Sequence, residues 1–243
     1  IDFDYKSPPL IRPTAIKLDE RKSLFILTHH HILLDGLSSP IVSRQVIQTY
    51  SAKKSGYVES DLEETPSYTD FLEWLAGRDS EEDRNFWKGY LKDFRPQGPL
   101  PMERRRGFAN GRSSFKRWGV RVQHSLALRV DSTASDLGVA KSAVYVSALA
   151  VTCSKYLGCK DLVIGLLYNG VEISESDRMV GMFMNTLPLR STLNGTRSVK
   201  SVIETTFYDQ LKISEHQHIS LNEIADKCSL PTDCLLYTSP SPR

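Results

Sequence analysis

Residues 23–36 of the chain read Ser-Leu-Phe-Ile-Leu-Thr-His-His-His-Ile-Leu-Leu-Asp-Gly. The apolar run over residues 23–28 is short and continuous, which predicts a strand buried on both faces. Three histidines extend its end. Because successive strand side chains alternate between faces, we expect His30 and His31 to point in opposite directions. One of them would then face the packed interior and the other a cavity at the strand tip.

The sequence after the histidines predicts a turn that leads into a helix. Asp35 and Gly36 are turn residues, and Ser38 or Ser39 can cap a helix with Pro40 at its first position. The apolar residues that follow recur at helical spacing, and we expect them to face inward: Ile41, Val42, Val46, Ile47 and Tyr50. The histidines are thus predicted to lie at a strand-to-helix junction.

A second helical region is predicted over residues 68–94, with a break at Gly77. Large side chains at roughly helical spacing predict its core face: Phe71, Leu72, Trp74, Leu75, Phe86, Trp87, Tyr90 and Leu91. Prolines, glycines and a run of three arginines predict a loop or connection between lobes over residues 95–114.

Beyond this connection, strands and helices are predicted to alternate. Residues 120–123 and 124–130 have the alternation of strands, residues 141–157 predict a buried helix, and residues 161–167 predict a further strand. This order favours an α/β architecture.

The composition excludes several classes of protein. The chain has 243 residues, of which 40% are hydrophobic, so it can bury a large core in one domain or two lobes. The net charge of +2 provides no basic field for nucleic acid or an anionic membrane. No apolar run approaches the ~20 residues that span a bilayer, and the start does not resemble a signal peptide, so a cytoplasmic location is expected. The cysteines lack metal-ligand spacing, which favours reduced structural thiols over zinc: Cys153, Cys159, Cys228 and Cys234.

Both ends of the sequence are predicted to be cut. The chain starts at Ile1 rather than Met and enters directly on a patterned segment. Residues 234–243, Cys-Leu-Leu-Tyr-Thr-Ser-Pro-Ser-Pro-Arg, look like the translation of a transposase-end sequencing adapter, so we exclude them from fold reasoning. The alternative is an ordinary Ser/Pro-rich disordered tail.

Several stretches occur in the order typical of one known family. Residues 30–36 fit the signature His-His-x-x-x-Asp-Gly, and residues 181–190, Gly-Met-Phe-Met-Asn-Thr-Leu-Pro-Leu-Arg, fit the segment Gly-x-Phe-x-Asn-Thr-x-x-x-Arg. Over residues 1–233 the chain therefore resembles the condensation domain of nonribosomal peptide synthetases, within the chloramphenicol-acetyltransferase-like superfamily. Shorter matches lie at residues 3–12, 86–91, 161–165 and 216–217. Departures are Gly170-Val171, where many members have Gly-Arg, and His29, which is more often apolar.

The resemblance implies a truncated α/β fold of two lobes, of chloramphenicol-acetyltransferase type. Residues 1–106 would complete the first lobe, residues 113–233 would begin the second, and the active site would lie between them. Because both lobes are needed to close the substrate tunnel, we expect the fragment alone to be inactive.

The resemblance also implies roles for the signature residues. His31 is the expected catalytic residue, as a general base or as a hydrogen-bonding positioner of the nucleophile. His30 is expected to pack or orient, and Asp35 to form a structural salt bridge to an arginine upstream of the chain. Gly36 is expected to serve the tight turn, where a side chain would obstruct the backbone or the substrate. Asn185 and Thr186 are left outside the catalytic set.

The implied function is amide-bond formation between a donor acyl or peptidyl thioester and an acceptor aminoacyl thioester. Both substrates would be carried on phosphopantetheine, and the domain would bind no metal or nucleotide cofactor itself. The expected partners are upstream and downstream peptidyl carrier domains and an adjacent adenylation domain, with no nucleic acid and no membrane.

Three alternatives to this function stay open. They are an epimerisation domain, a stand-alone acyltransferase that makes esters, and an inactive domain that only recruits partners. Heterocyclisation is disfavoured, because that branch replaces the histidine pair with aspartate.

Overall fold

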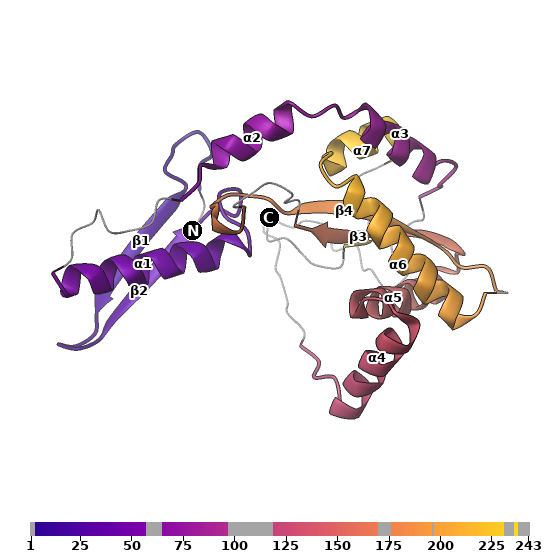
Figure 1. Ribbon diagram of the computed structural model, residues 1–243, viewed down its shortest axis with the longest axis horizontal. Helices are drawn as coiled ribbons and strands as arrows, with labels where there is room; N and C mark the ends of the chain where they lie inside the picture. The colour runs from indigo at the N-terminus through magenta and orange to yellow at the C-terminus, as the bar shows by residue number, and fades with distance from the viewer. Residues whose placement is uncertain are drawn as a thin grey trace, which may run out of the picture. The chain divides into compact units, whose positions relative to one another are not determined.

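The computed structural model describes residues 3–56, 65–96, 119–169, 176–195, 197–230 and 236–237. These residues form two compact units (Figure 1). The first holds the described residues up to 79 together with 169 and 176–184, and the second holds the rest. The predicted lobe boundary at residues 106–113 lies outside the described residues, so the division into lobes 1–106 and 113–233 stays a prediction.

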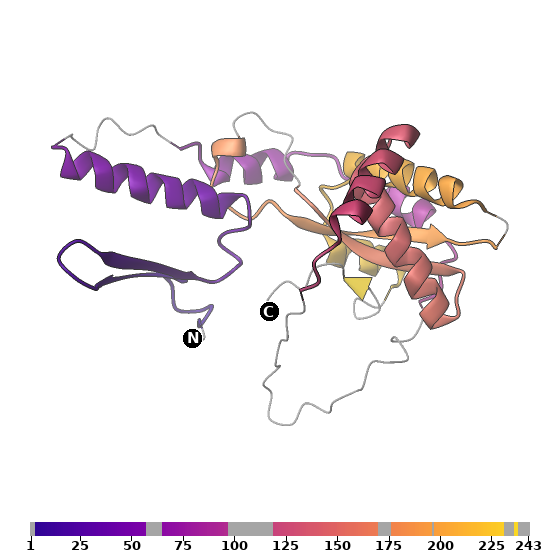
Figure 2. The ribbon, with the colours of Figure 1, turned by 90° about the horizontal axis from the view of Figure 1, so that it is seen from below.

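The first unit begins with an antiparallel hairpin of β1 (Ile11–Lys17) and β2 (Ser23–His29), in which Ile11 faces His29 and Lys17 faces Ser23. Helix α1 (Ser38–Lys54) runs alongside the hairpin in both views (Figures 1 and 2). Helix α2 (Tyr68–Ala76) and the short η3 (Ser176–Arg178) complete the unit.

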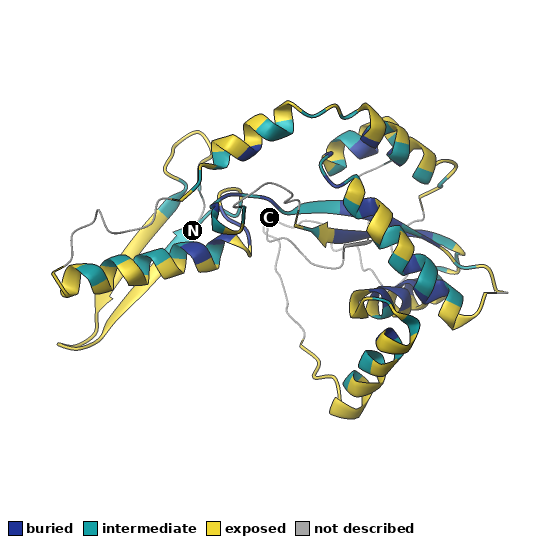
Figure 3. Cartoon of the chain, in the orientation of Figure 1, coloured by how far each residue is buried: buried dark blue, intermediate teal, exposed yellow. Residues whose placement is uncertain are grey.

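The prediction that β2 is buried on both faces is wrong for the described chain. Leu24 and Phe25 are 45% and 49% exposed, and the hairpin is exposed along most of its length (Figure 3). An apolar run predicts a strand, but burial also needs a packing layer on each face. Among the described residues the sheet has two strands, and no element covers these side chains.

The predicted helix after the turn is present as α1, but it begins two residues earlier than predicted. Leu37 is the cap residue, and neither Ser38 nor Ser39 caps with its side chain; Pro40 is the third helical residue rather than the first. The predicted inward face is buried only near its start. Ile41 is buried, Val42 and Val46 are half-buried, and Ile47 and Tyr50 are exposed.

The predicted helical region with a break at Gly77 is confirmed. Helix α2 ends at Ala76, and α3 (Glu81–Tyr90) follows. The side chain of Ser67 caps α2 by accepting the N–H of Thr69 at 3.1 Å. Most of the predicted core face is buried or half-buried, with Trp87 fully buried, whereas Leu72 is 46% exposed.

The second unit is built on a sheet with the strand order β4-β3-β5. Strands β3 (Asp161–Tyr168) and β4 (Asn185–Thr192) are antiparallel, and β5 (Leu236–Tyr237) pairs parallel to β3. Helix α5 (Lys141–Leu157) packs on β3, while α6 (Val199–Glu215) and α7 (Leu221–Cys228) pack on β4, and α3 packs on α7. Strand β5 lies within residues 234–243, whose origin in a sequencing adapter stays a prediction.

Two of the elements predicted for this unit are confirmed, and one prediction is wrong. The helix over residues 141–157 and the strand from Asp161 are present. Instead of strands over residues 120–130, the chain forms helix α4 (His124–Leu137). Its inward side chains recur every three or four residues: Ala127, Val130, Ala134 and Leu137. The alternating Leu126 and Leu128, which suggested a strand, are about half exposed.

No single helix in the described parts of the chain is both long and apolar enough to cross a membrane. Helices α4 and α5 taken together meet the length and composition, but they are bent by 109°.

Candidate functional site

The histidine motif lies where β2 gives way to a turn in the first unit. Strand β2 ends at His29, and the N–H of His30 still donates to the carbonyl of Leu10 at 2.9 Å. The turn begins immediately afterwards, because the N–H of Leu33 donates to the carbonyl of His30 at 3.1 Å. The prediction that all three histidines extend the strand is therefore wrong, and strand alternation does not set the direction of His31.

Both ring nitrogens of His30 are occupied. The N–H of Ile32 donates to Nδ1 at 3.1 Å, so a neutral ring carries its proton on Nε2, which lies 2.9 Å from the hydroxyl of Tyr5. The rings of Phe3 and Tyr5 contact the imidazole edge-to-face, with centroids at 6.4 and 4.8 Å. His30 is thus held in place by packing and hydrogen bonds.

His31 is half-buried and differs from its neighbours. Its Nδ1 is buried and has no hydrogen-bond partner among the described residues. By contrast, Nδ1 of His29 lies 3.2 Å from the carbonyl of His30, and since a carbonyl only accepts, this nitrogen carries the proton. A buried, unsatisfied polar atom costs about 1–3 kcal/mol, so its occurrence at His31 marks a site that is not built for stability alone.

The carboxylate of Asp35 is buried and binds four backbone N–H groups. Its Oδ1 accepts from Leu37 and Ser38, each at 2.9 Å, and its Oδ2 accepts from Phe183 at 2.9 Å and Met184 at 3.3 Å. These four hydrogen bonds satisfy both carboxylate oxygens and stabilise their negative charge. The predicted arginine would lie upstream of residue 1, so the salt bridge stays a prediction.

Sequence reasoning missed a second set of contacts beside the motif. The Ser38 hydroxyl is fully buried; it donates to the carbonyl of Gly181 at 2.6 Å and accepts its N–H at 2.9 Å. The hydroxyl of Tyr68 donates to the carbonyl of Met182 at 2.7 Å. Burial raises the pKa of Tyr68, and the charge of Asp35 adds to the rise, so this phenol stays protonated as a donor. The signal available in the sequence was the Gly181 segment, which matched a family motif.

Gly36 is placed differently from expectation. A Cβ built on it meets no heavy atom within 4 Å, and its φ is not in the left-handed region. The expected obstruction of the backbone by a side chain is therefore wrong. The expected obstruction of the substrate stays a prediction.

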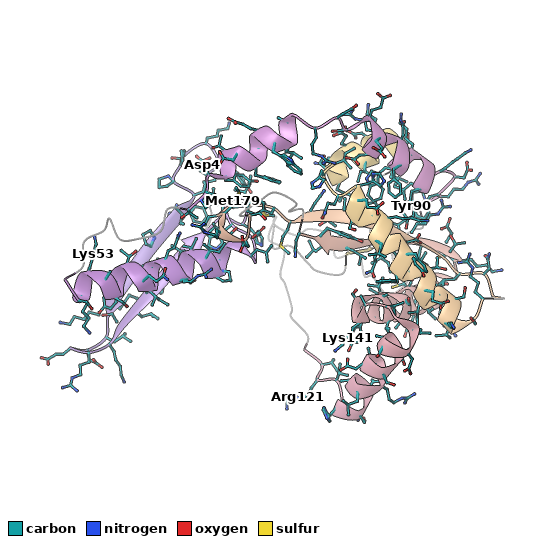
Figure 4. The ribbon with its side chains drawn as sticks, viewed as in Figure 1. Asp4, Lys53, Tyr90, Arg121, Lys141 and Met179 are labelled. Carbon is teal, nitrogen blue, oxygen red and sulfur yellow. The ribbon has the colours of Figure 1, made fainter. Side chains whose placement is uncertain are left out.

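Segment 179–184 also contributes side chains to the interior of the first unit. Met179 and Phe183 are buried against Phe71, and the ring of Tyr68 meets that of Phe183 edge-to-face at 5.2 Å. Figure 4 labels Met179 in this segment. The segment is thus held by its side chains as well as by its backbone.

The second unit holds the residues left outside the catalytic set. The Asn185 amide donates to the carbonyls of Gln217 and Ile219 at 2.9 and 2.7 Å, a structural role that fixes the turn after α6. In the same turn, Nδ1 of His216 donates to the buried Asp83 at 2.7 Å. No cluster of three or more His, Cys, Asp or Glu side chains that could hold a metal occurs in the described residues.

Comparison with known proteins places this geometry in context. The family model described as "Condensation domain" matches residues 1–237. Bacitracin synthase 3 of Bacillus licheniformis is 30% identical over 237 residues, which cover 96% of this chain and 4% of that protein. The chain therefore spans a small part of this curated relative.

Two solved structures are similar in fold. The X-domain from teicoplanin biosynthesis has a TM-score of 0.81 at 20% identity, over 94% of this chain and 53% of that one. The first condensation domain of the CDA synthetase has a TM-score of 0.67 at 20% identity, over 94% and 50%. These likenesses confirm the predicted fold, and the chain spans about half of each of these structures.

Proposed function

We propose that the chain supplies the catalytic histidine of an acyltransferase that forms amide bonds. The chain belongs to the condensation-domain family, which supports this proposal. The acceptor amine attacks the donor thioester carbonyl, the C–N bond forms, the C–S bond breaks, and the thiol of the donor carrier leaves. The ammonium proton of the tetrahedral intermediate must be removed, and the oxyanion must be stabilised. No metal or nucleotide takes part in these steps.

The contrast within the motif carries this proposal. His30 uses both ring nitrogens in hydrogen bonds, and Asp35 uses both carboxylate oxygens, so each is engaged in structure. His31 lies between these two anchored residues, and its Nδ1 forms no hydrogen bond to any described residue. An imidazole titrates near neutral pH and can accept or donate a proton. His31 is therefore the signature side chain left available for the reaction.

The proposed substrates are an acyl or peptidyl donor and an aminoacyl acceptor, each on the phosphopantetheine arm of a carrier domain. Their proposed sources are upstream and downstream carriers beside an adenylation domain. The similarity to bacitracin synthase 3 over 4% of its length supports such a multidomain setting. Long-read sequencing of the locus tests it: flanking carrier and adenylation domains support condensation, whereas a short free-standing frame favours the ester-forming acyltransferase.

The catalytic role is tested with His31→Ala in the complete protein encoded by the reading frame. We expect folding to be retained and amide formation from two loaded carriers to fall by about 10²-fold or more, the usual contribution of a general base. His124→Ala, at the exposed start of α4, is the matched control and should retain full activity. Unchanged condensation by the His31 variant would mean that the domain recruits partners or uses another residue.

A second substitution separates the two roles of His31. Glutamine donates and accepts hydrogen bonds but does not titrate near neutral pH. If His31 is the base, His31→Gln is as inactive as His31→Ala. Substantial activity in His31→Gln would assign a positioning role.

A further inference from the structure

Four consecutive residues, 181–184, have five backbone polar groups held by three side chains of the first unit. Ser38 binds the N–H and the carbonyl of Gly181, Tyr68 binds the carbonyl of Met182, and Asp35 binds the N–H groups of residues 183 and 184. We call Asp35, Ser38 and Tyr68 the backbone clamp. Asp35 lies in the turn formed by the signature residues 30–36, which we call the signature turn, whereas Ser38 is the first residue of α1 and Tyr68 the first residue of α2.

The Ser38 hydroxyl has no function as a helix cap, although serine at the start of a helix usually caps. Its donor and an acceptor lone pair are both used on Gly181, 143 residues away in the sequence. The side chain is completely buried, so water cannot replace either bond. The hydroxyl therefore fixes where the segment lies against the signature turn.

Gly181 also lies very close to the ring of Tyr68. A Cβ at this position would lie 2.1 Å from Cδ2 of the Tyr68 ring, so only glycine allows the ring and the segment to meet. The clamp thus holds the segment by hydrogen bonds on one side and by ring contact on the other.

Asp35 joins the clamp to the proposed catalytic residue. Its Oδ1 binds the N–H groups of Leu37 and Ser38, directly after the signature turn, while its Oδ2 binds two N–H groups of the segment. Displacement of the segment would pull on the carboxylate, and hence on the turn that carries His31. Reaction rates are sensitive to such shifts, since a misplacement of about 1 Å can cost about 10²-fold.

We propose that Ser38 is a positioning residue for His31, acting through the backbone clamp; this inference rests on the proposed function. The Ser38 hydroxyl fixes the segment, the segment completes the hydrogen bonds of Asp35, and Asp35 fixes the turn. Ser38 itself touches no reacting atom.

The test is Ser38→Ala in the complete protein, assayed for kcat and KM with loaded carriers. We expect kcat per folded molecule to fall about 10- to 100-fold, KM to change by less than about 3-fold, and the pH-rate profile to keep its shape. Ser39→Ala is the matched control: its hydroxyl donates to the carbonyl of Asp35 at 2.9 Å and forms no bond to the segment. Ser38→Cys, similar in size with a weaker donor, should restore part of kcat.

Hydrogen exchange provides a readout that does not depend on activity. The amide hydrogens of residues 181, 183 and 184 should exchange faster in Ser38→Ala than in the parent protein. Their exchange rates should be unchanged in Ser39→Ala. Unaltered exchange, or a loss of activity that only follows the unfolded fraction, would overturn the proposal. If the parent protein forms no amide at all, the proposed function fails, while exchange still decides whether Ser38 holds the segment.

Discussion

His30 and His31 are adjacent and chemically identical, yet their rings differ in how many hydrogen bonds they form. The ring of His30 is hydrogen-bonded at both nitrogens and contacts two aromatic rings edge-to-face. The Nδ1 of His31 has no such bond within the described chain. The proposal that His31 is the catalytic histidine therefore rests on which ring nitrogens already form hydrogen bonds.

Gly36 offers a sharp prediction because its surroundings are open. A methyl group at this position meets no heavy atom within 4 Å and the backbone is not strained, so Gly36→Ala should change the free energy of unfolding by less than about 0.5 kcal/mol. If the glycine leaves room for the substrate, kcat/KM should still fall by about 10-fold or more. Urea unfolding and steady-state assays measure the two effects.

Gly181→Ala is the matched comparison. Its methyl group would overlap the Tyr68 ring, which should cost about 1–3 kcal/mol of stability through overpacking. Full activity in Gly36→Ala would show that the signature glycine is not required by the substrate.

At the scale of elements, β2 and β3 show why an apolar run is an incomplete signal. Both are continuous apolar strands in the sequence, yet residues 162–166 of β3 are buried, whereas the first four residues of β2 are exposed. The difference arises from neighbours: β3 has a strand on each side and α5 on one face, while β2 pairs only with β1 in the described chain. Figure 3 shows the two strands with opposite burial.

Asp209 on α6 predicts a pH dependence of stability. Burial raises its pKa above the ordinary 3.8, and this effect exceeds the lowering by Lys212 and Arg197. A raised carboxyl pKa stabilises the fold below the unfolded value, and this contribution is lost as the pH rises through the folded pKa. Asp209→Asn should therefore be more stable than the parent at pH 7, by urea unfolding.

The stability gain of Asp209→Asn should shrink as the pH falls through the raised pKa and vanish below about 3.8. A gain that is the same at every pH would show that charge burial is not its cause. The substitution also removes the charge that, after burial, raises the pKa values of Tyr90 and Tyr168.

At the scale of the whole molecule, contacts between residues far apart in sequence hold each unit together. Arg190 on β4 forms two bonds with Asp161 on β3, at 2.9 and 2.8 Å. It also donates to the carbonyl of Tyr90, the last residue of α3, and to that of Lys92 just beyond it. A lysine cannot reproduce this planar fork of donors. Arg190→Lys should therefore lower the free energy of unfolding by about 2 kcal/mol, measured by urea titration.

The exposed ion pair of Lys141 with Asp131, at 2.8 Å, is the control for this prediction. Its partners are 61% and 45% exposed, so Lys141→Met should cost less than about 1 kcal/mol. Equal losses for the two variants would show that the Arg190 network adds no more than a surface pair.

The sequence alone determined the family, the α/β class, the break at Gly77 and the helix and strand over residues 141–168. Each of these follows from local spacing, turn chemistry or an ordered motif, which need no knowledge of distant neighbours. The prediction of strands in place of α4 was wrong because it relied on the alternation of Leu126 and Leu128. Both side chains are about half exposed, so their alternation does not mark a buried face.

Only the tertiary structure decided the partners of the candidate site. The bonds of Asp35 to residues 183 and 184, of Ser38 to Gly181 and of Tyr68 to Met182 join positions more than 100 residues apart. A sequence records that a residue can donate or accept, but folding decides which backbone group comes within 3 Å of it. For that reason His31 could be proposed from its motif, whereas the clamp that holds its turn could not.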